Sequence, residues 1–181
     1  MIKTGIGFDA HRLVKGRRLI LGGVSIDYPL GLAGHSDADV LCHAFADALL
    51  GAMADGDIGM HFPDTDPRWK DANSLDLLAQ VVARLKGRRT RVVHVDATVM
   101  AEAPKLVSYR QAMRERLARV LEVPVQGVSI KATTMEGMGA LGRREGIAAI
   151  AVATVAVSKR TTDGRRQTTA RKRGKSRRQK N

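Results

Sequence analysis

Three residues in the first quarter of the chain have types and spacing that could bind a divalent metal ion. Asp9 and His11 are separated by one residue, and in an extended segment such positions point to the same side. A carboxylate and an imidazole suit zinc or a similar cation. Alone, the pair is more often a hydrogen-bonded surface pair. His43 would complete three protein ligands and leave a fourth position for substrate or water.

The segment before His43 contains features that suit phosphate. We expect a helix from residues 35–37 to about Ala54, because apolar residues recur there at helical spacing and Ser36 or Asp37 can cap it. His35 would then lie at the mouth of this helix, where free backbone N–H groups favour anions such as phosphate.

Other polar residues of the same helix could support the site. Asp39 and Asp47 each lie four residues from His43, so either could orient its ring. A single histidine in an apolar helix is commonly a core residue, but two histidines with several carboxylates favour a site. Cys42 is expected to be a small buried hydrophobic residue.

Two later segments have compositions that fit substrate binding. Residues 55–67 are rich in Asp, Gly and Pro and form either an ordinary polar loop or a lid that binds substrate hydroxyls through Asp57 and Asp64. Residues 131–136 end an expected strand with two threonines that could cradle phosphate oxygens, and Glu136 could hold a second cation such as magnesium. A glycine-rich turn that carries Arg143 follows.

The elements that must position these residues form an α+β pattern. Strands are expected at 3–8, 18–21, 24–28, 91–100, 127–133 and 146–157, and helices at 35–54, 74–86 (capped by Ser74) and 104–121 (with Pro104 at its start). Residues 29–34 and 55–73 are expected to be loops. Strand 146–157 is apolar at nearly every position, so both of its faces need cover. Another subunit could supply that cover.

Bulk composition limits the class of protein. The chain has 181 residues, of which 44% are apolar, which suits one domain with a tail. Cys42 is the one cysteine, so no internal disulfide is possible and a reducing compartment is expected. The sequence contains no long apolar stretch and no signal-peptide pattern at its start. We therefore expect a soluble cytoplasmic protein.

The charge of the chain is concentrated at its C-terminal end. Residues 158–181 hold 11 Lys and Arg and one Asp, a net charge of +10, whereas residues 1–157 carry only +3. We expect residues 1–157 to form the domain and residues 158–181 to be a basic disordered tail. The tail is either a solvated extension or a segment that contacts nucleic acid or another polyanion.

Together these residues resemble the family of 2-C-methyl-D-erythritol 2,4-cyclodiphosphate synthases of the non-mevalonate (MEP) isoprenoid precursor pathway. The matching stretches are 7–11, 35–39, 47–52, 56–59, 62–67, 103–105, 131–134, 142–143 and 145–148. They lie in the family order and cover about residues 1–157, which makes the resemblance specific. It implies an enzyme that converts 4-diphosphocytidyl-2-C-methyl-D-erythritol 2-phosphate to the cyclic diphosphate and releases CMP, a phosphorus–oxygen lyase reaction.

The resemblance also implies the assembly and the metals. It implies a single domain whose mixed β-sheet is covered by helices on one face, with the sheets packed around the axis of a homotrimer and active sites between subunits. Asp9, His11 and His43 match zinc ligands, and Glu136 matches a ligand of a second cation, Mg²⁺ or Mn²⁺.

The resemblance implies further roles residue by residue. His35 and Thr134 match transition-state stabilisers. The substrate-binding positions that match are Asp9, His11, His35, Ser36, Asp57, Ile58, Gly59, Phe62, Pro63, Asp64, Thr65, Asp66, Ala101, Pro104, Lys105, Leu106, Val107, Ala132, Thr133, Thr134, Met135, Ala140 and Arg143. Met135 stands where a third threonine is common. Ala140 stands where an aromatic residue is frequent and Ile150 where some members have a glutamate; both match positions at the trimer axis, next to Arg143.

Two rival functions remain from the residues alone. A zinc hydrolase would use a metal-bound hydroxide and give a linear product or inorganic phosphate. A nucleic-acid-binding protein would depend on the basic tail. No Ser-His-Asp or Cys-His arrangement is apparent. That agrees with an intramolecular phosphate reaction, because alignment and charge neutralisation can drive it without a protein nucleophile.

Overall fold

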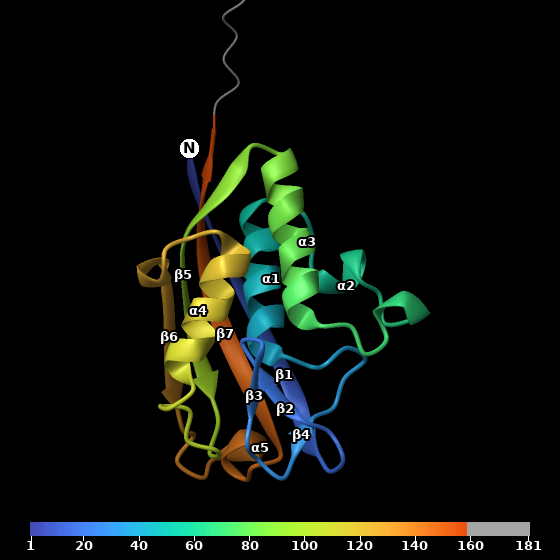
Figure 1. The fold of residues 1–181 in the computed structure, drawn as a ribbon. Coiled ribbons are helices and arrows are strands. Elements are labelled where there is room, and N and C mark those ends of the chain that lie inside the picture. The colour runs from blue at the N-terminus through green and yellow to red at the C-terminus, as the bar shows by residue number, and fades with distance from the viewer. Residues whose placement is uncertain (159–181) are drawn as a thin grey trace, which may run out of the picture.

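The centre of the fold is a five-stranded mixed sheet with the strand order β4–β1–β7–β5–β6, in a computed structural model that describes residues 1–158 (Figure 1). Its strands are β1 (Ile2–Val14), β4 (Gly31–Leu32), β5 (Thr90–Met100), β6 (Val128–Thr133) and β7 (Gly146–Val157). Strand β7 pairs antiparallel with β1 and β5, whereas β5 and β6 are parallel. The expected hairpin forms from β2 (Leu19–Leu21) and β3 (Val24–Ile26) around Gly22 and Gly23.

Three long helices lie on one face of this sheet (Figure 1). They are α1 (Val40–Ala52), α3 (Ser74–Gly87) and α4 (Arg110–Leu121). Short helical turns connect the longer elements: α2 (Ile58–His61), η1 (Pro67–Trp69), η2 (Val125–Gly127) and α5 (Gly139–Gly142). The predicted α+β class, the mixed sheet and its cover of helices are therefore confirmed.

Two glycines allow β1 and α1 to approach each other closely. A Cβ atom added at Gly5 would lie 2.1 Å from the carbonyl oxygen of Ala48, and one at Gly7 would lie 2.1 Å from that of Ala44. Because strand residues alternate between faces, Asp9 follows Gly5 and Gly7 on the side of β1 that faces α1. This contact brings Asp9 next to the first turns of the helix, where His43 lies.

The opposite face of the sheet is apolar, and the described residues 1–158 leave it uncovered. Ile6 and Phe8 of β1 are 64% and 58% exposed, and Ile150 and Val152 of β7 are 37% and 39% exposed. Phe8 is paired with Ile150 and Ile6 with Val152, so the four side chains form one patch, which we call the open face. The sequence predicted that β7 needs cover on two sides, and the described chain covers one.

Several predicted element boundaries are wrong. Helix α1 begins at Val40 rather than at residues 35–37, because Asp39 is its N-cap and Ala38 has a left-handed backbone with φ of 58°. Helix α4 begins at Arg110 rather than at Pro104, because residues 101–109 form irregular turns after β5, and the Ala101 amide donates to the Thr133 carbonyl oxygen at the end of β6. Asn73, not Ser74, caps α3.

Other differences add structure to predicted loops. Strand β1 continues to Val14, far beyond residue 8, because it pairs with β7 through Arg12 and with β4 beyond it. The loop predicted at 29–34 contains β4, and the loop predicted at 55–73 contains α2 and η1. These short elements depend on hydrogen bonds to residues distant in the sequence or on a single capping side chain. The spacing of apolar residues in the sequence reveals neither.

The ends of the described chain lie side by side. The terminal amino group donates to the carbonyl oxygen of Val157 at 3.0 Å, and the Ser158 amide donates to that of Arg89 at 3.0 Å. The basic tail predicted at 158–181 lies, beyond Ser158, outside the described residues. Within residues 1–158, none of the helices combines the length and the apolar character needed to cross a membrane.

Candidate metal centre and the α4–β6 cavity

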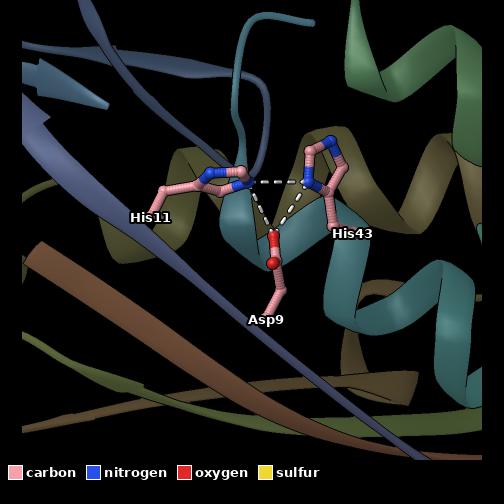
Figure 2. Close-up of side chains that lie close together, drawn as sticks. All are labelled: Asp9, His11 and His43. Atoms are coloured by element: carbon pink, nitrogen blue, oxygen red, sulfur yellow. Dashed lines mark hydrogen bonds and ion pairs between the residues drawn. The ribbon is translucent and has the colours of Figure 1, made fainter. Parts of the chain in front are cut away.

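Asp9, His11 and His43 converge on one point between β1 and α1 (Figure 2). Asp9 Oδ2 lies 3.0 Å from His11 Nε2 and 2.8 Å from His43 Nδ1, and the two ring nitrogens are 3.3 Å apart. A tetrahedral cation with bonds of about 2.0–2.1 Å needs ligand atoms roughly 3.3 Å apart. The three residues thus form a site able to hold a divalent cation after a shift of a few tenths of an ångström at Asp9.

The charges of this cluster are strongly coupled. Burial raises the pKa of Asp9, but the hydrogen bonds and charges of His11 and His43 outweigh burial and hold that pKa well below its usual range. Burial lowers the pKa of His43, but the hydrogen bond and negative charge of Asp9 outweigh it and raise that pKa. Asp9 is therefore an anion at neutral pH, which is the form that binds a cation.

Neither carboxylate that the sequence offered as a partner for His43 contacts its ring. Asp39 is fully buried and accepts from four amides, those of Gly22, Gly23, Leu41 and Cys42. Asp47 instead accepts from the Ile58 amide at 2.7 Å, which ties α2 to α1. The ring is held by Ser74 Oγ and Ser36 Oγ, at 2.9 and 3.1 Å from His43 Nε2.

The start of α1 is not free to bind phosphate. The Asp39 carboxylate occupies the Leu41 and Cys42 amides, so the predicted anion site at the mouth of this helix is wrong. Burial raises the pKa of Asp39 despite its four amide donors, and it raises the pKa of the Cys42 thiol together with the nearby Asp39 charge. Cys42 is 1% exposed, which agrees with its predicted structural role.

His35 and Ser36 lie in the turn before α1 and are held there by an arginine. Arg17 donates to the carbonyl oxygens of Gly34 and Ser36 at 3.0 and 2.5 Å. His35 is partly exposed, and its Nε2 lies 3.3 Å from the Asp66 carbonyl oxygen. This turn therefore connects the metal centre with the segment that contains α2.

Most of the segment from Asp57 to Asp66 is solvent-accessible. Asp57 caps α2 by accepting from the Met60 amide at 2.9 Å, and Asp66 forms an ion pair with Arg68 that lowers its pKa. Phe62 packs edge-on against Trp69, with ring centroids 5.0 Å apart. The remaining predicted positions of this segment are half-buried at Ile58 and Pro63 and exposed at Gly59, Asp64 and Thr65.

A second concave site lies between α4 and the end of β6, and we call it the α4–β6 cavity. Its volume is about 340 Å³, which is within the range of small-molecule sites. Eight of the predicted substrate-binding residues line it: Ala101, Pro104, Lys105, Leu106, Val107, Ala132, Thr133 and Thr134. Glu102, between the predicted positions Ala101 and Pro104, and Lys131, in the predicted segment 131–136, also line it. The sequence did not single out Arg110, Met113 and Ile130, which complete the lining.

The loop after β6 is arranged around two carboxylates. Thr134 Oγ1 donates to Glu136 Oε1 at 2.7 Å, and Glu102 Oε1 accepts from the Met135 amide at 2.6 Å. Both Thr134 and Glu136 are exposed. Ala140 lies in α5, and Arg143, just after it, forms an ion pair with Glu145 at 2.7 Å, so neither residue lines the described cavity.

The described chain brings the predicted residues together in two groups. The first contains the metal centre, the turn with His35 and Ser36, and the segment around α2. The second contains the cavity and the Thr134–Glu136 loop. The metal centre and the cavity share no residue, and Figure 1 places α2 and β6 on opposite sides of α1.

An α+β domain with three residues able to hold a divalent cation and a separate cavity of small-molecule size has the parts of an enzyme site. The model of the YgbB family matches residues 2–156, and the chain belongs to this family.

Comparison with individual proteins agrees with this assignment. The chain is 60% identical over 152 residues to the 2-C-methyl-D-erythritol 2,4-cyclodiphosphate synthase of Symbiobacterium thermophilum, covering 84% of this chain and 97% of that protein. A solved 2C-methyl-D-erythritol-2,4-cyclodiphosphate synthase bound to CDP matches with a TM-score of 0.79 at 35% identity, covering 85% of this chain and all of that one.

A longer protein also contains this fold. The bifunctional IspDF of Campylobacter jejuni matches with a TM-score of 0.84 at 41% identity and covers 87% of this chain. This chain spans only 43% of that protein, so the similarity concerns one part of it.

Proposed function

We propose that this chain converts 4-diphosphocytidyl-2-C-methyl-D-erythritol 2-phosphate to 2-C-methyl-D-erythritol 2,4-cyclodiphosphate and CMP, as an enzyme of the non-mevalonate isoprenoid pathway in the cytoplasm. The observation that carries the proposal is the convergence of Asp9, His11 and His43 in a chain that matches the family over residues 2–156. The activity for which the relatives are named supports the product, and the CDP bound to a solved relative supports a substrate linked to cytidine diphosphate.

The chemistry requires alignment rather than a protein nucleophile. An oxygen of the 2-phosphate attacks the β-phosphorus of the diphosphate, the bond from that phosphorus to the CMP oxygen breaks, and CMP leaves. Because the reaction is intramolecular, holding both phosphates in contact contributes much of the rate. The enzyme must also offset the repulsion between two anionic groups.

The residues divide these tasks between them. Asp9, His11 and His43 would hold zinc, and Glu136 would hold Mg²⁺ or Mn²⁺, since carboxylate oxygens suit harder cations. Bound there, the cations supply positive charge to the phosphate oxygens. His35 and Thr134 donate hydrogen bonds to charge that develops on those oxygens, and the α4–β6 cavity binds the cytidine.

The proposal includes a homotrimer with active sites between subunits. The open face supports it, because an apolar patch of this kind usually marks an interface. The separation of the metal centre from the cavity supports it as well, since a neighbouring subunit could bring its cavity to the metal centre. Closed rotational symmetry would repeat this contact three times.

Mixing two inactive variants tests this arrangement. His43→Ala damages the metal half of a site and Thr134→Val damages the cavity half. Trimers reassembled from equal amounts contain sites with two intact halves, and roughly a quarter of the wild-type activity is expected because each half is intact with a probability of one half. No recovery in mixed trimers would place both halves in one subunit and refute a shared site.

Product analysis tests the reaction itself. The purified zinc-loaded chain is incubated with the substrate and Mg²⁺, and the products are separated and weighed by mass spectrometry. We expect CMP and the cyclic diphosphate in equal amounts. A linear product that contains an added water molecule would show a zinc hydrolase and overturn the cyclase proposal.

A further inference from the structure

The His43 ring has a second contact that faces away from the metal centre. Its Nδ1 points to Asp9, and its Nε2 lies 2.9 Å from Ser74 Oγ, at the first residue of α3. Ser74 is 1% exposed and comes from an element that contributes no metal ligand. Its hydroxyl is not needed as a helix cap, because Asn73 caps α3.

A carboxylate fixes the direction of this contact. Asp37 accepts from the Ser74 amide at 3.1 Å through Oδ2 and from the Ser74 hydroxyl through Oδ1. An ionised carboxylate can only accept, so the hydroxyl proton of Ser74 points to Asp37. The lone pairs of Ser74 Oγ are then available to a proton on His43 Nε2, which also lies 3.1 Å from Ser36 Oγ. When a cation takes the place of the Nδ1 proton that faces Asp9, Nε2 holds the one proton of the neutral ring.

The position of this proton decides whether the ring can bind a metal through the nitrogen that faces it. A neutral imidazole carries one proton, so a proton on Nε2 leaves the lone pair of Nδ1 free. Nδ1 is the atom 2.8 Å from Asp9 Oδ2 and 3.3 Å from His11 Nε2. His11 presents the other nitrogen, Nε2, to the same point, so the two rings need opposite tautomers.

We propose that Asp37 and Ser74 are positioning residues of the metal centre, which hold His43 in the Nε2–H tautomer and orient its ring. The inference rests on the proposed function, because it assumes that the three ligands hold a cation. The inference goes beyond the proposed function, because it assigns a role to Ser74, which is 31 residues away from His43 in the sequence, and to Asp37, which orients Ser74. Partners of this kind change metal affinity by about 10–100-fold when they are removed.

Zinc affinity of the full chain is the first measurement. Zinc is titrated in competition with a chromophoric chelator into the wild type and into the variants Ser74→Ala and Asp37→Asn. We expect Ser74→Ala to weaken zinc binding by roughly tenfold or more. Asp37→Asn should act in the same direction, because an amide nitrogen placed at Ser74 Oγ donates and turns the hydroxyl proton toward His43.

Matched controls separate this effect from general damage. Ser25→Ala and Asp27→Asn change the same residue types at exposed positions near the β2–β3 hairpin and should leave zinc affinity unchanged. Circular dichroism and the melting temperature of the zinc-free proteins report folding. Wild-type affinity in both Ser74→Ala and Asp37→Asn would overturn the inference.

The tautomer of His43 is the second measurement, and it does not depend on activity. Two-bond ¹H–¹⁵N correlation spectra of the zinc-loaded chain should show His43 with its proton on Nε2 and with Nδ1 bound to the cation. Ser74→Ala should give a mixture of tautomers, while His11 serves as the internal reference. An Nδ1–H form of His43 in the wild type would also overturn the inference.

The two proposals fail in different ways. A wild type that binds no zinc would remove the proposed metal centre, and the role of Asp37 and Ser74 with it. A wild type that binds zinc, with variants that bind it equally well, would remove only the role of Asp37 and Ser74.

Discussion

The metal centre and the α4–β6 cavity differ in how the fold holds them. The ligands Asp9, His11 and His43 come from strand β1 and from the largely buried helix α1, and each ligand atom lies within hydrogen-bond distance of another. The cavity is lined by irregular backbone at residues 101–107 and by the exposed end of β6. One site lies on regular elements against the core, whereas the other lies at the surface and is lined partly by irregular backbone.

This difference suggests a division of work. A site on rigid elements can keep ligand atoms in place before the cation arrives, which limits the reorganisation that binding requires. A site made of loops can adapt to a nucleotide and release it afterwards. Changes at the metal centre should therefore abolish both metal and activity, whereas changes in the cavity should affect substrate and leave the metal in place.

The largest effect is expected for His43→Ala. The variant should lose its zinc, as measured by elemental analysis, and CMP release should fall by about 10³-fold or more, because cation charge on the phosphate oxygens is worth several kcal/mol. Circular dichroism checks that the fold is intact. A variant that keeps one zinc per chain would show that the ligand assignment is wrong.

Thr134→Val should retain zinc and lose turnover. The substitution removes one hydroxyl donor at nearly constant volume, and loss of one such donor costs about 10²–10³-fold in kcat. Glu136→Gln distinguishes the role of the Thr134 hydroxyl from that of the second cation. This variant should shift the dependence of the rate on Mg²⁺ concentration. An unchanged kcat in Thr134→Val would exclude a catalytic role for this hydroxyl.

Ala132→Leu should weaken nucleotide binding without loss of zinc or of turnover. Ala132 lines the cavity, and a larger side chain would fill space that a ring could occupy. Calorimetry with CDP should show affinity reduced by about tenfold, with unchanged zinc content. Ala79→Leu, at an exposed position of α3, is the matched control. Equal CDP affinity in both variants would place the nucleotide elsewhere.

The pH dependence of stability should differ between the zinc-free and zinc-loaded proteins. The raised pKa of His43 stabilises the zinc-free fold below about 6.5, and this contribution is lost as the pH rises through the folded-state value. The lowered pKa of Asp9 contributes stability above about 3.8, which is lost as the pH falls toward its folded-state value. The interaction between Asp9 and His43 therefore stabilises the zinc-free fold most between about pH 3.8 and pH 6.5.

The affinity for zinc should increase with pH, whereas the contribution of His43 to the stability of the zinc-free fold decreases. Zinc competes with the proton on His43, so apparent affinity should rise by up to about tenfold per pH unit until the ring is neutral. Melting temperatures of the zinc-free and zinc-loaded chain across this range check both trends. A zinc-induced stabilisation of the wild type that does not increase with pH over this range would contradict this assignment.

The metal centre was predictable because its determinants are mostly local. Asp9 and His11 follow from strand alternation, and His43 from a helix whose existence the apolar pattern shows. The start of that helix was not predictable, because Ser36, Asp37 and Asp39 are all good caps. Amides of Gly22 and Gly23, in a distant hairpin, select the buried Asp39.

The support behind His43 was missed for a related reason. Ser74 looked like a helix cap, which is the commonest use of a serine before an apolar run. Its contact with His43 spans 31 residues and depends on how α3 packs beside α1. Likewise, Pro104 resembled a helix start, but the Ala101 amide bonds to the Thr133 carbonyl oxygen, and residues 101–109 form irregular turns before α4.

Deleting residues 159–181 should have the smallest effect on both sites. The relative from Symbiobacterium thermophilum matches 152 residues of this chain with 97% of its own length, so the family activity needs no counterpart of this segment. We expect unchanged zinc content and CMP release. Retention on an anionic polymer at low salt should be lost, because the deleted residues carry most of the excess positive charge. Retention equal to that of the full chain would show that the tail is only a solvated extension, whereas reduced turnover would give it a part in the reaction.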